Sequence, residues 1–285
     1  MTEAVKRFAA SAEWHKWWTQ FRVIAAREYH RNVFTKRGLW IYFLAFAPAA
    51  IILMHALNEL DSNCTMSEDT KILSGIIMLF YVRLGIFFGC LGLFTWLFRG
   101  EIVQKSLHYY FLAPVRREVL VLGKFAAGVL TSVTLFGAGV LLCYIFMYGH
   151  FGVAGQNFTF DGPGLGHLRN YLAITVLACV GYGAIFLALS LVVKNPIIPG
   201  TMVFMWEAIS GVFPDILQKM SVTFYLKSLA PVPLKEEGIL ALFTVVPDPV
   251  PLWLAIPGMA VMAAVMLVFA CWRIQSVEVT YSTSD

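Results

Sequence analysis

Long apolar segments recur along this chain and constrain its fold more than any other feature. They cover residues 39–57, 76–98, 120–148, 171–193, 197–213 and 252–272, and each is nearly free of charge. A helix of about 20 apolar residues crosses the hydrocarbon core of a bilayer. Only helices and closed barrels satisfy their backbone hydrogen bonds in lipid. The sequence therefore predicts an all-α integral membrane protein with six transmembrane helices.

The composition agrees with this prediction. The chain is 59% hydrophobic and 13% charged, whereas soluble domains have about 45–50% apolar residues. Its net charge of +4 does not indicate a nucleic-acid partner, because the Lys and Arg residues flank the apolar segments. Four of the five cysteines lie in apolar segments and no Cys-x-x-Cys occurs, so we expect neither disulfides nor a metal site. No apolar run typical of a cleavable signal peptide lies in the first 35 residues.

The distribution of Lys and Arg predicts the orientation. Fifteen of the 21 fall on one side of the proposed membrane and five on the other. Because cytoplasmic loops carry the excess of positive charge, both termini are expected to be cytoplasmic. The predicted parts are a cytoplasmic N-terminal region (1–38), a six-span domain (39–273) and a cytoplasmic tail (274–285).

The N-terminal region contains a predicted amphipathic helix over 12–37. Apolar residues recur there at helical spacing, and cations occupy much of the remainder. Tryptophan and Lys/Arg in this pattern are typical of a helix lying in the membrane interface against anionic lipid. The alternative is a soluble helix packed on a partner protein. The apolar set is Trp14, Trp17, Trp18, Phe21, Ile24 and Ala25.

The stretch 99–124 between the second and third apolar segments is dense in charge. Its apolar residues suggest two short amphipathic helices. Pro114 separates them, because a residue before proline avoids the helical region. The stretch is expected to be a short cytoplasmic element on which a soluble partner acts, or else an ordinary basic loop that fixes orientation.

The same stretch resembles the cytoplasmic loop of ABC-2 type transporter permeases. The matching pattern is a Glu, then Ser-Leu, then Leu-x-x-Pro-x-x-Arg, then Leu-x-Gly-Lys; where the family often has an acidic residue and Gly before the Ser, this chain has Gln104 and Lys105. The resemblance implies a coupling helix within 99–118 that docks on a separate ATPase. The residues assigned to this coupling are Arg99, Glu101, Ser106, Leu107, Pro114, Arg116, Arg117, Gly123 and Lys124.

The resemblance also implies the remaining assembly. It predicts a permease homodimer in a bacterial inner membrane, bound to two copies of an ABC ATPase and exporting an amphiphilic or hydrophobic substrate. ATP and Mg²⁺ would bind to the partner. This chain carries no Walker A loop, since Glu118 stands where the first Gly is needed and Phe125 follows Lys124. We therefore expect this chain to be a transport subunit with no cofactor and no catalytic residues of its own.

Composition predicts the structure of two connecting segments. Residues 149–168 are rich in Gly and are predicted to form an external loop. Residues 215–251 are too polar to span, but prolines bracket an apolar run at 238–246. A helix of about ten residues covers only about 15 Å, so this segment is predicted to form short re-entrant or interfacial helices on the outer side. The alternative is a poorly ordered loop.

Two charges lie inside predicted spans, Arg83 in the second and Glu207 in the fifth. A charge at a helix centre costs about 2.5–3.5 kcal/mol on the insertion scale, so both should face protein or water. Together with Phe204 and Trp206 they are candidates for lining the substrate route. The alternatives are a structural Arg83–Glu207 ion pair or, for Arg83, extension to the outer interface.

Two other classes of protein remain open at this point. One is an ion-coupled secondary transporter that uses Glu207 as a proton site. It should show internal inverted repeats, and none is visible in the sequence. The other is a membrane anchor or assembly factor without transport activity.

Overall fold

A computed structural model describes residues 3–34, 38–58, 65–104, 106–112, 114–193, 195–232 and 251–276. These residues are helical apart from short connections. In chain order the helices are α1 Glu3–Phe34, α2 Leu39–Asn58, α3 Met66–Gly75, η3 Ile76–Ile86, α4 Phe87–Val103, α5 Leu107–Leu112, α6 Arg117–Gly149, α7 Val153–Phe160, α8 Gly164–Val192, α9 Ile197–Ile209, η4 Ser210–Val212, α10 Asp215–Gln218, α11 Val222–Lys227 and α13 Leu252–Gln275.

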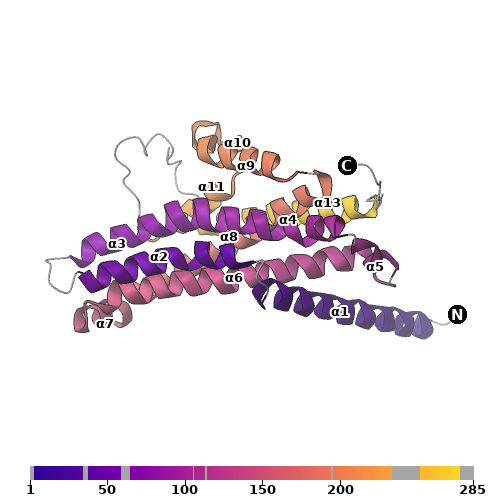
Figure 1. The fold of residues 1–285 in the computed structure, drawn as a ribbon, viewed down its shortest axis with the longest axis horizontal. Coiled ribbons are helices and arrows are strands. Elements are labelled where there is room, and N and C mark those ends of the chain that lie inside the picture. The colour runs from indigo at the N-terminus through magenta and orange to yellow at the C-terminus, as the bar shows by residue number, and fades with distance from the viewer. Residues whose placement is uncertain are drawn as a thin grey trace.

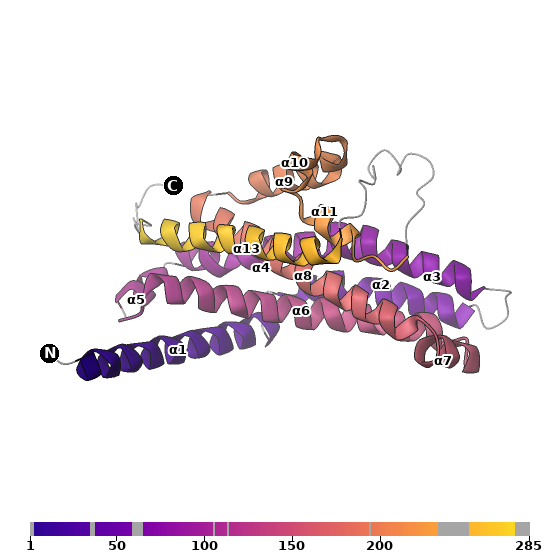
Figure 2. The ribbon, with the colours of Figure 1, turned by 180° about the vertical axis from the view of Figure 1, so that it is seen from behind.

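Five helices in the described ranges are long and apolar enough to cross a membrane: α2, the continuous α3–η3–α4 helix, α6, α8 and α13. They run side by side along the longest dimension of the molecule (Figure 1). Helix α8 packs against α4, α6 and α13, and α6 also packs against α1 and α2. Helices α5 and α7 lie at opposite ends of this bundle, which we call the α5 end and the α7 end. Helix α1 begins and α13 ends at the α5 end (Figure 2).

The expected sixth span is shorter than the others. Residues 197–212 form α9, with 13 residues, followed by the three-residue 3₁₀ helix η4. Together they cover about 25 Å, less than the roughly 30 Å hydrocarbon core. The structure thus supports a multi-pass helical architecture with five full-length candidate spans, and the sixth stays a prediction.

Two predictions about connections were wrong. Residues 149–168 are not a loop, because they contain α7 and the first turn of α8. The stretch 99–124 contains one short helix, α5, rather than two. The second predicted helix is the beginning of α6, which runs unbroken from Arg117 because nothing interrupts the apolar helix beyond Pro114.

The second span differs from expectation in length and winding. It extends over Met66–Val103, and its middle part, η3, is a π-helix of 11 residues. Small residues on this helix lie against bulky side chains of its neighbours. A side chain at Gly92 would strike the Trp40 ring, and one at Gly89 would strike Phe136. These two glycines therefore allow α2 and α6 to pack closely against α4.

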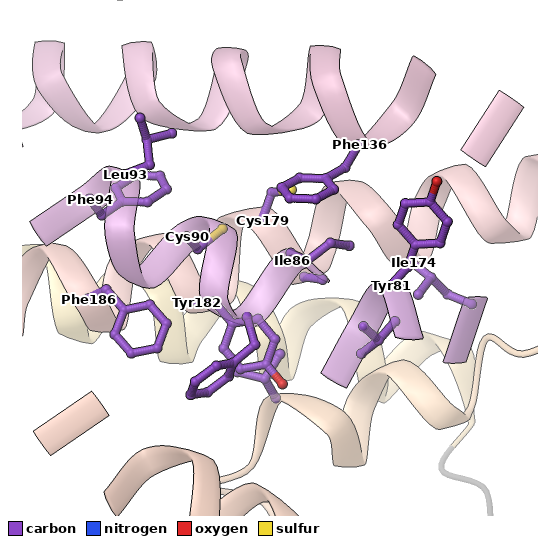
Figure 3. Close-up of a cluster of buried hydrophobic side chains, with 14 of the residues drawn as sticks. Tyr81, Ile86, Cys90, Leu93, Phe94, Phe136, Ile174, Cys179, Tyr182 and Phe186 are labelled. Atoms are coloured by element: carbon purple, nitrogen blue, oxygen red, sulfur yellow. The ribbon is translucent and has the colours of Figure 1, made fainter. Parts of the chain in front are cut away.

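The core lies where η3, α4, α6 and α8 meet (Figure 3). Aromatic rings dominate it. Phe87 packs edge-on against Tyr182 and Phe186, each at a centroid distance of 5.1 Å. Such pairs contribute about 0.5–1.5 kcal/mol beyond their buried area. This core holds the long helices in one arrangement and so fixes the positions of the polar groups at the two ends.

The segment before α13 is only partly described. Its first part contains the short helices α10 and α11, and Ser221 caps α11 by accepting a hydrogen bond from the Phe224 amide. The predicted apolar run at 238–246 lies outside the described residues.

Candidate functional site

The short helix α5 forms the tip of the α5 end. Its Leu112 side chain is 79% exposed, and Tyr109 and the nearby Val103 are also exposed, while Leu107 is fully buried. Ser106 directly precedes the helix, and its amide donates to the Glu101 carbonyl at 2.9 Å. Helix α5 therefore presents apolar side chains outward and is attached to the end of α4 through Leu107 and Ser106.

A buried ion network lies directly behind α5. The Lys124 side chain is completely buried, and its ammonium group lies 2.7 Å from Glu101 Oε1 and 3.2 Å from Glu28 Oε1. It also donates to the Leu97 carbonyl at 2.9 Å. The three donors of the ammonium group thus have three acceptors. The rings of Phe98 and Tyr110 flank it at 5.3 and 5.2 Å.

Arg31 completes the network. Its guanidinium lies 2.8 Å from Glu28 Oε2 and 3.3 Å from Glu101 Oε1. The four side chains Glu28, Arg31, Glu101 and Lys124 carry no net charge together. They join α1, α4 and α6, and the Tyr110 hydroxyl of α5 donates to Glu28 Oε1 at 3.3 Å. Burial, followed by the Glu101 and Glu28 carboxylates, raises the pKa of Tyr110 to about 12, so this hydroxyl keeps its proton.

Glu101 and Lys124 are therefore bound inside this chain. The sequence-based prediction assigned both to coupling with an ATPase. Their side chains are buried, so they hold the end of α4 against α6 and do not belong to an exposed surface.

The other predicted coupling residues surround this network. Arg116 lies 4.0 Å from the centroid of the Trp17 ring, and the exposed Pro114 accepts a hydrogen bond from Gln20 at its carbonyl. Arg117 donates to the Ile274 and Gln275 carbonyls at 3.2 and 2.7 Å. A side chain at Gly123 would come within 2.9 Å of Ile24, so this glycine permits the close packing of α1 on α6. Arg99, the last of the set, lines a cavity.

That cavity has a volume of about 740 Å³. It is lined by the end of α1, the start of α2, the last turns of α4 and the connection from α8 to α9. Its walls carry two tryptophans, two arginines and several amides. The lining residues are Arg31, Asn32, Gly38, Trp40, Ile41, Gly92, Leu93, Thr95, Trp96, Arg99, Val103, Gln104, Asn195, Pro196 and Ile197.

The residues predicted to line the substrate route lie outside this cavity. The Glu207 carboxylate is 7% exposed and accepts hydrogen bonds from the amides of Val222 and Thr223 at 2.8 and 3.0 Å. The hydroxyls of Ser221, at 2.7 Å, and Thr223 also donate to it. Glu207 therefore holds the start of α11 against α9.

The remaining route candidates do not converge on one cavity. Phe204 packs against Phe87 at 5.3 Å. Trp206 stacks on Phe213 and lines a cavity of about 540 Å³ on the α9 surface. Arg83 is half-buried on η3.

Sequence reasoning missed two buried acids. Glu28 follows Phe21 and Ile24 at spacings of seven and four, so its position on the apolar side of α1 could have been recognised. Asp69 is fully buried at the α7 end, 3.6 Å from His55 Nε2 and 3.4 Å from His150 Nε2. No local pattern indicates this cluster, because its members come from α2, α3 and the residue after α6.

The fold and these sites define the general class of the protein. Five long apolar helices around a common core are the architecture of a multi-pass membrane protein. Comparison with known proteins gave no match, either to a family model or to a curated protein.

Proposed function

We propose that the chain is the membrane-spanning subunit of an ATP-driven exporter, in which α5 docks on a separate ATPase of the ABC class. The observation that carries this proposal is the double character of α5. It exposes Leu112 beyond the long helices, and it connects to α1, α4 and α6 through the buried ion network behind it. A helix that is both accessible and firmly attached can transmit force from a partner to the spans.

The course of the chain supports six crossings. Arg117, which begins α6, bonds to the carbonyls that end α13, so α13 ends at the α5 end. Helix α8 starts beside α7 and therefore runs in the same direction as α13. The chain must return toward the α7 end between them, and α9 begins that return. We propose α9 and η4 as the sixth crossing, with both termini cytoplasmic.

The α5 end would then face the cytoplasm, in agreement with the excess of Lys and Arg there. In this proposal two copies of the chain form the permease and bind two ATPase subunits in a bacterial inner membrane. Export as the direction of transport rests on the resemblance to ABC-2 permeases. The proposed motion passes from α5 through Glu28, Glu101 and Lys124 to α1, α4 and α6.

Affinity purification of the tagged chain from native membranes tests this function. We expect an ATPase to co-elute in a stoichiometric amount, and Leu112→Asp and Val103→Asp to release it. Val153→Asp is the matched control for Val103→Asp, because these valines are 71% and 70% exposed and lie at opposite ends. No co-eluting ATPase with the wild-type chain, or full retention by Leu112→Asp, would overturn the proposal.

A further inference from the structure

The continuous helix formed by α3, η3 and α4 keeps one face in the bundle with an unusual spacing. A pair of neighbouring residues is buried every four residues along it. An α-helix has 3.6 residues per turn, so its buried positions normally follow spacings that alternate between three and four. The buried pairs are 73–74, 77–78, 81–82, 85–86, 89–90, 93–94 and 97–98.

The winding of η3 accounts for this spacing. In an all-α helix four residues turn the chain by about 400°, so the buried face would drift by about 40° at each repeat. A π-helix bonds residue i to residue i+5 and takes about one residue more per turn. Over the 11 residues of η3 this removes about half a turn. The π winding therefore brings the buried faces of α3 and α4 to the same side of the helix.

Side chains of α3 hold this orientation at the α7 end. Asp69 is fully buried, 3.6 Å from His55 Nε2 of α2 and 3.4 Å from His150 Nε2 just after α6. One turn further along α3, the Ser74 hydroxyl donates to the Val232 carbonyl at 3.1 Å. A buried carboxylate needs compensating groups beside it, so these contacts favour the face that α3 now presents to the bundle.

The junction between α3 and η3 has room for a rotation. Gly75 stands at this junction, and a side chain there would meet nothing within 4 Å. Hinges often use small residues at the ends of elements. At the far end of the same helix, Glu101 is held by Lys124 in the buried ion network. The π-helix thus lies between two anchored ends of one long helix.

We propose that η3 is a rotary joint, in which surplus residues allow α3 to turn about the helix axis relative to α4. The contacts of Asp69 with His55 and His150 hold the joint in its π-wound position. The inference concerns conformations of this chain itself, so it stands or falls independently of whether an ATPase binds.

The proposal specifies which residues change places. Rewinding one π turn as an α turn moves the pattern of α3 by one residue, or about 100°. Leu73 then takes the exposed position of Ile72, and Asp69 takes that of Glu68. Ser74 stays buried, because it takes the position of Leu73.

Cysteine labelling in nanodiscs tests this rotation, with the reaction of the native cysteines subtracted. Leu73→Cys, at a buried position, should react slowly with a maleimide, and Ile72→Cys, at a position 45% exposed, should react fast. With Asp69→Asn added, we expect Leu73→Cys to react as fast as Ile72→Cys and Ser74→Cys to stay slow. Glu68→Gln changes the neighbouring exposed acid and should leave Leu73→Cys slow.

Two labelling results would overturn the proposal. Slow reaction of Leu73→Cys in a folded Asp69→Asn chain would show that Asp69 does not hold the joint. Fast reaction of both Leu73→Cys and Ser74→Cys would show that α3 unfolds locally instead of turning.

Single-residue deletions test the surplus in η3 without changing Asp69, and they decide the proposal even where Asp69→Asn fails to fold. Leu84 in η3 and Leu141 in α6 are matched, with exposed fractions of 39% and 40%. Deletion of Leu84 shortens one spacing from four to three, as in an α-helix, and should lower the unfolding temperature by less than about 5 °C. Deletion of Leu141 turns the remainder of α6 by about 100° and should prevent folding or lower that temperature far more. Equal effects of the two deletions would overturn the joint.

Discussion

The Lys124 ammonium group lies 2.7 Å from Glu101 Oε1, and both side chains are buried. This pair joins the end of α4 to the start of α6 on either side of α5. Breaking a buried pair by removing one partner typically costs about 3–5 kcal/mol, because the remaining charge is left without compensation. The pair therefore determines how firmly α5 is connected to the long helices.

We expect Lys124→Met to lower the stability of the protein by about 3–5 kcal/mol. The substitution keeps the length of the side chain but leaves Glu28 and Glu101 with Arg31 alone. Thermal unfolding in nanodiscs measures the effect. Lys71→Met, at an exposed position on α3, is the control and should change stability by about 0.5 kcal/mol or less. Adding Glu101→Gln to Lys124→Met should cost less than the sum of the two single changes, and strict additivity would contradict the network.

Arg117→Met should loosen the last turn of α13. The guanidinium satisfies the Ile274 and Gln275 carbonyls, and bonds to charged donors contribute about 1.5–3 kcal/mol. Amide hydrogen exchange in a peptide covering 268–276 should accelerate about tenfold or more. The neighbouring Arg116→Met removes a charge that lies over Trp17 instead, and it should leave this peptide unchanged. Equal exchange in both variants would show that Arg117 does not hold the helix end.

Glu207→Gln should destabilise the contact between α9 and α11. The carboxylate oxygens accept from two amides and two hydroxyls, whereas an amide NH₂ in the same place would face donors. A buried donor left unsatisfied costs about 1–3 kcal/mol, and we expect a loss in that range from thermal unfolding. Glu13→Gln, at an exposed position on α1, should have no measurable effect. Normal stability combined with altered transport would instead favour the role of Glu207 in the substrate route.

Two glycines in α6 should respond to alanine with opposite signs. A side chain at Gly139 would collide with the backbone of Ala45 and lie 2.7 Å from the Tyr81 hydroxyl, whereas nothing lies within 4 Å of one at Gly137. Gly139→Ala is expected to cost about 1–3 kcal/mol through overpacking. Gly137→Ala is expected to stabilise the protein by about 0.4–1 kcal/mol, since it restricts the unfolded chain. Thermal unfolding of both variants measures these changes in stability. A change of the same sign in both variants would contradict the close approach of α2 to α6.

Several elements could be predicted from the sequence because their causes are local. The predicted segments 39–57 and 252–272 match α2 and α13 closely, since continuous apolar composition itself defines a membrane-crossing helix. The helix at the N-terminus and the break at Pro114 also follow from local patterns.

Other elements were not predicted correctly, because the local sequence gives little indication of their structure. Glycine content indicated a loop at 149–168, but α7 forms there and packs against α6 and α8. The π-helical winding of η3 has no sequence signal that we recognise. Hydropathy predicts a full span over 197–213, whereas the helix there covers only Ile197–Val212, which is marginal for a span.

What the sequence by itself determined is the class of the protein, because apolar runs of sufficient length must be kept from water whatever their neighbours are. The bias of Lys and Arg adds a prediction of their orientation. The tertiary structure alone decided the partners of the charged residues. The sequence predicts that Glu101 and Lys124 face a docking partner. In the structure Lys124 instead forms ion pairs with Glu101 and with Glu28 of α1. The Glu207 carboxylate accepts hydrogen bonds from Ser221, Val222 and Thr223. It lines neither of the two cavities described above. A buried charge must find compensation nearby, and which group lies nearby depends on how distant helices pack together.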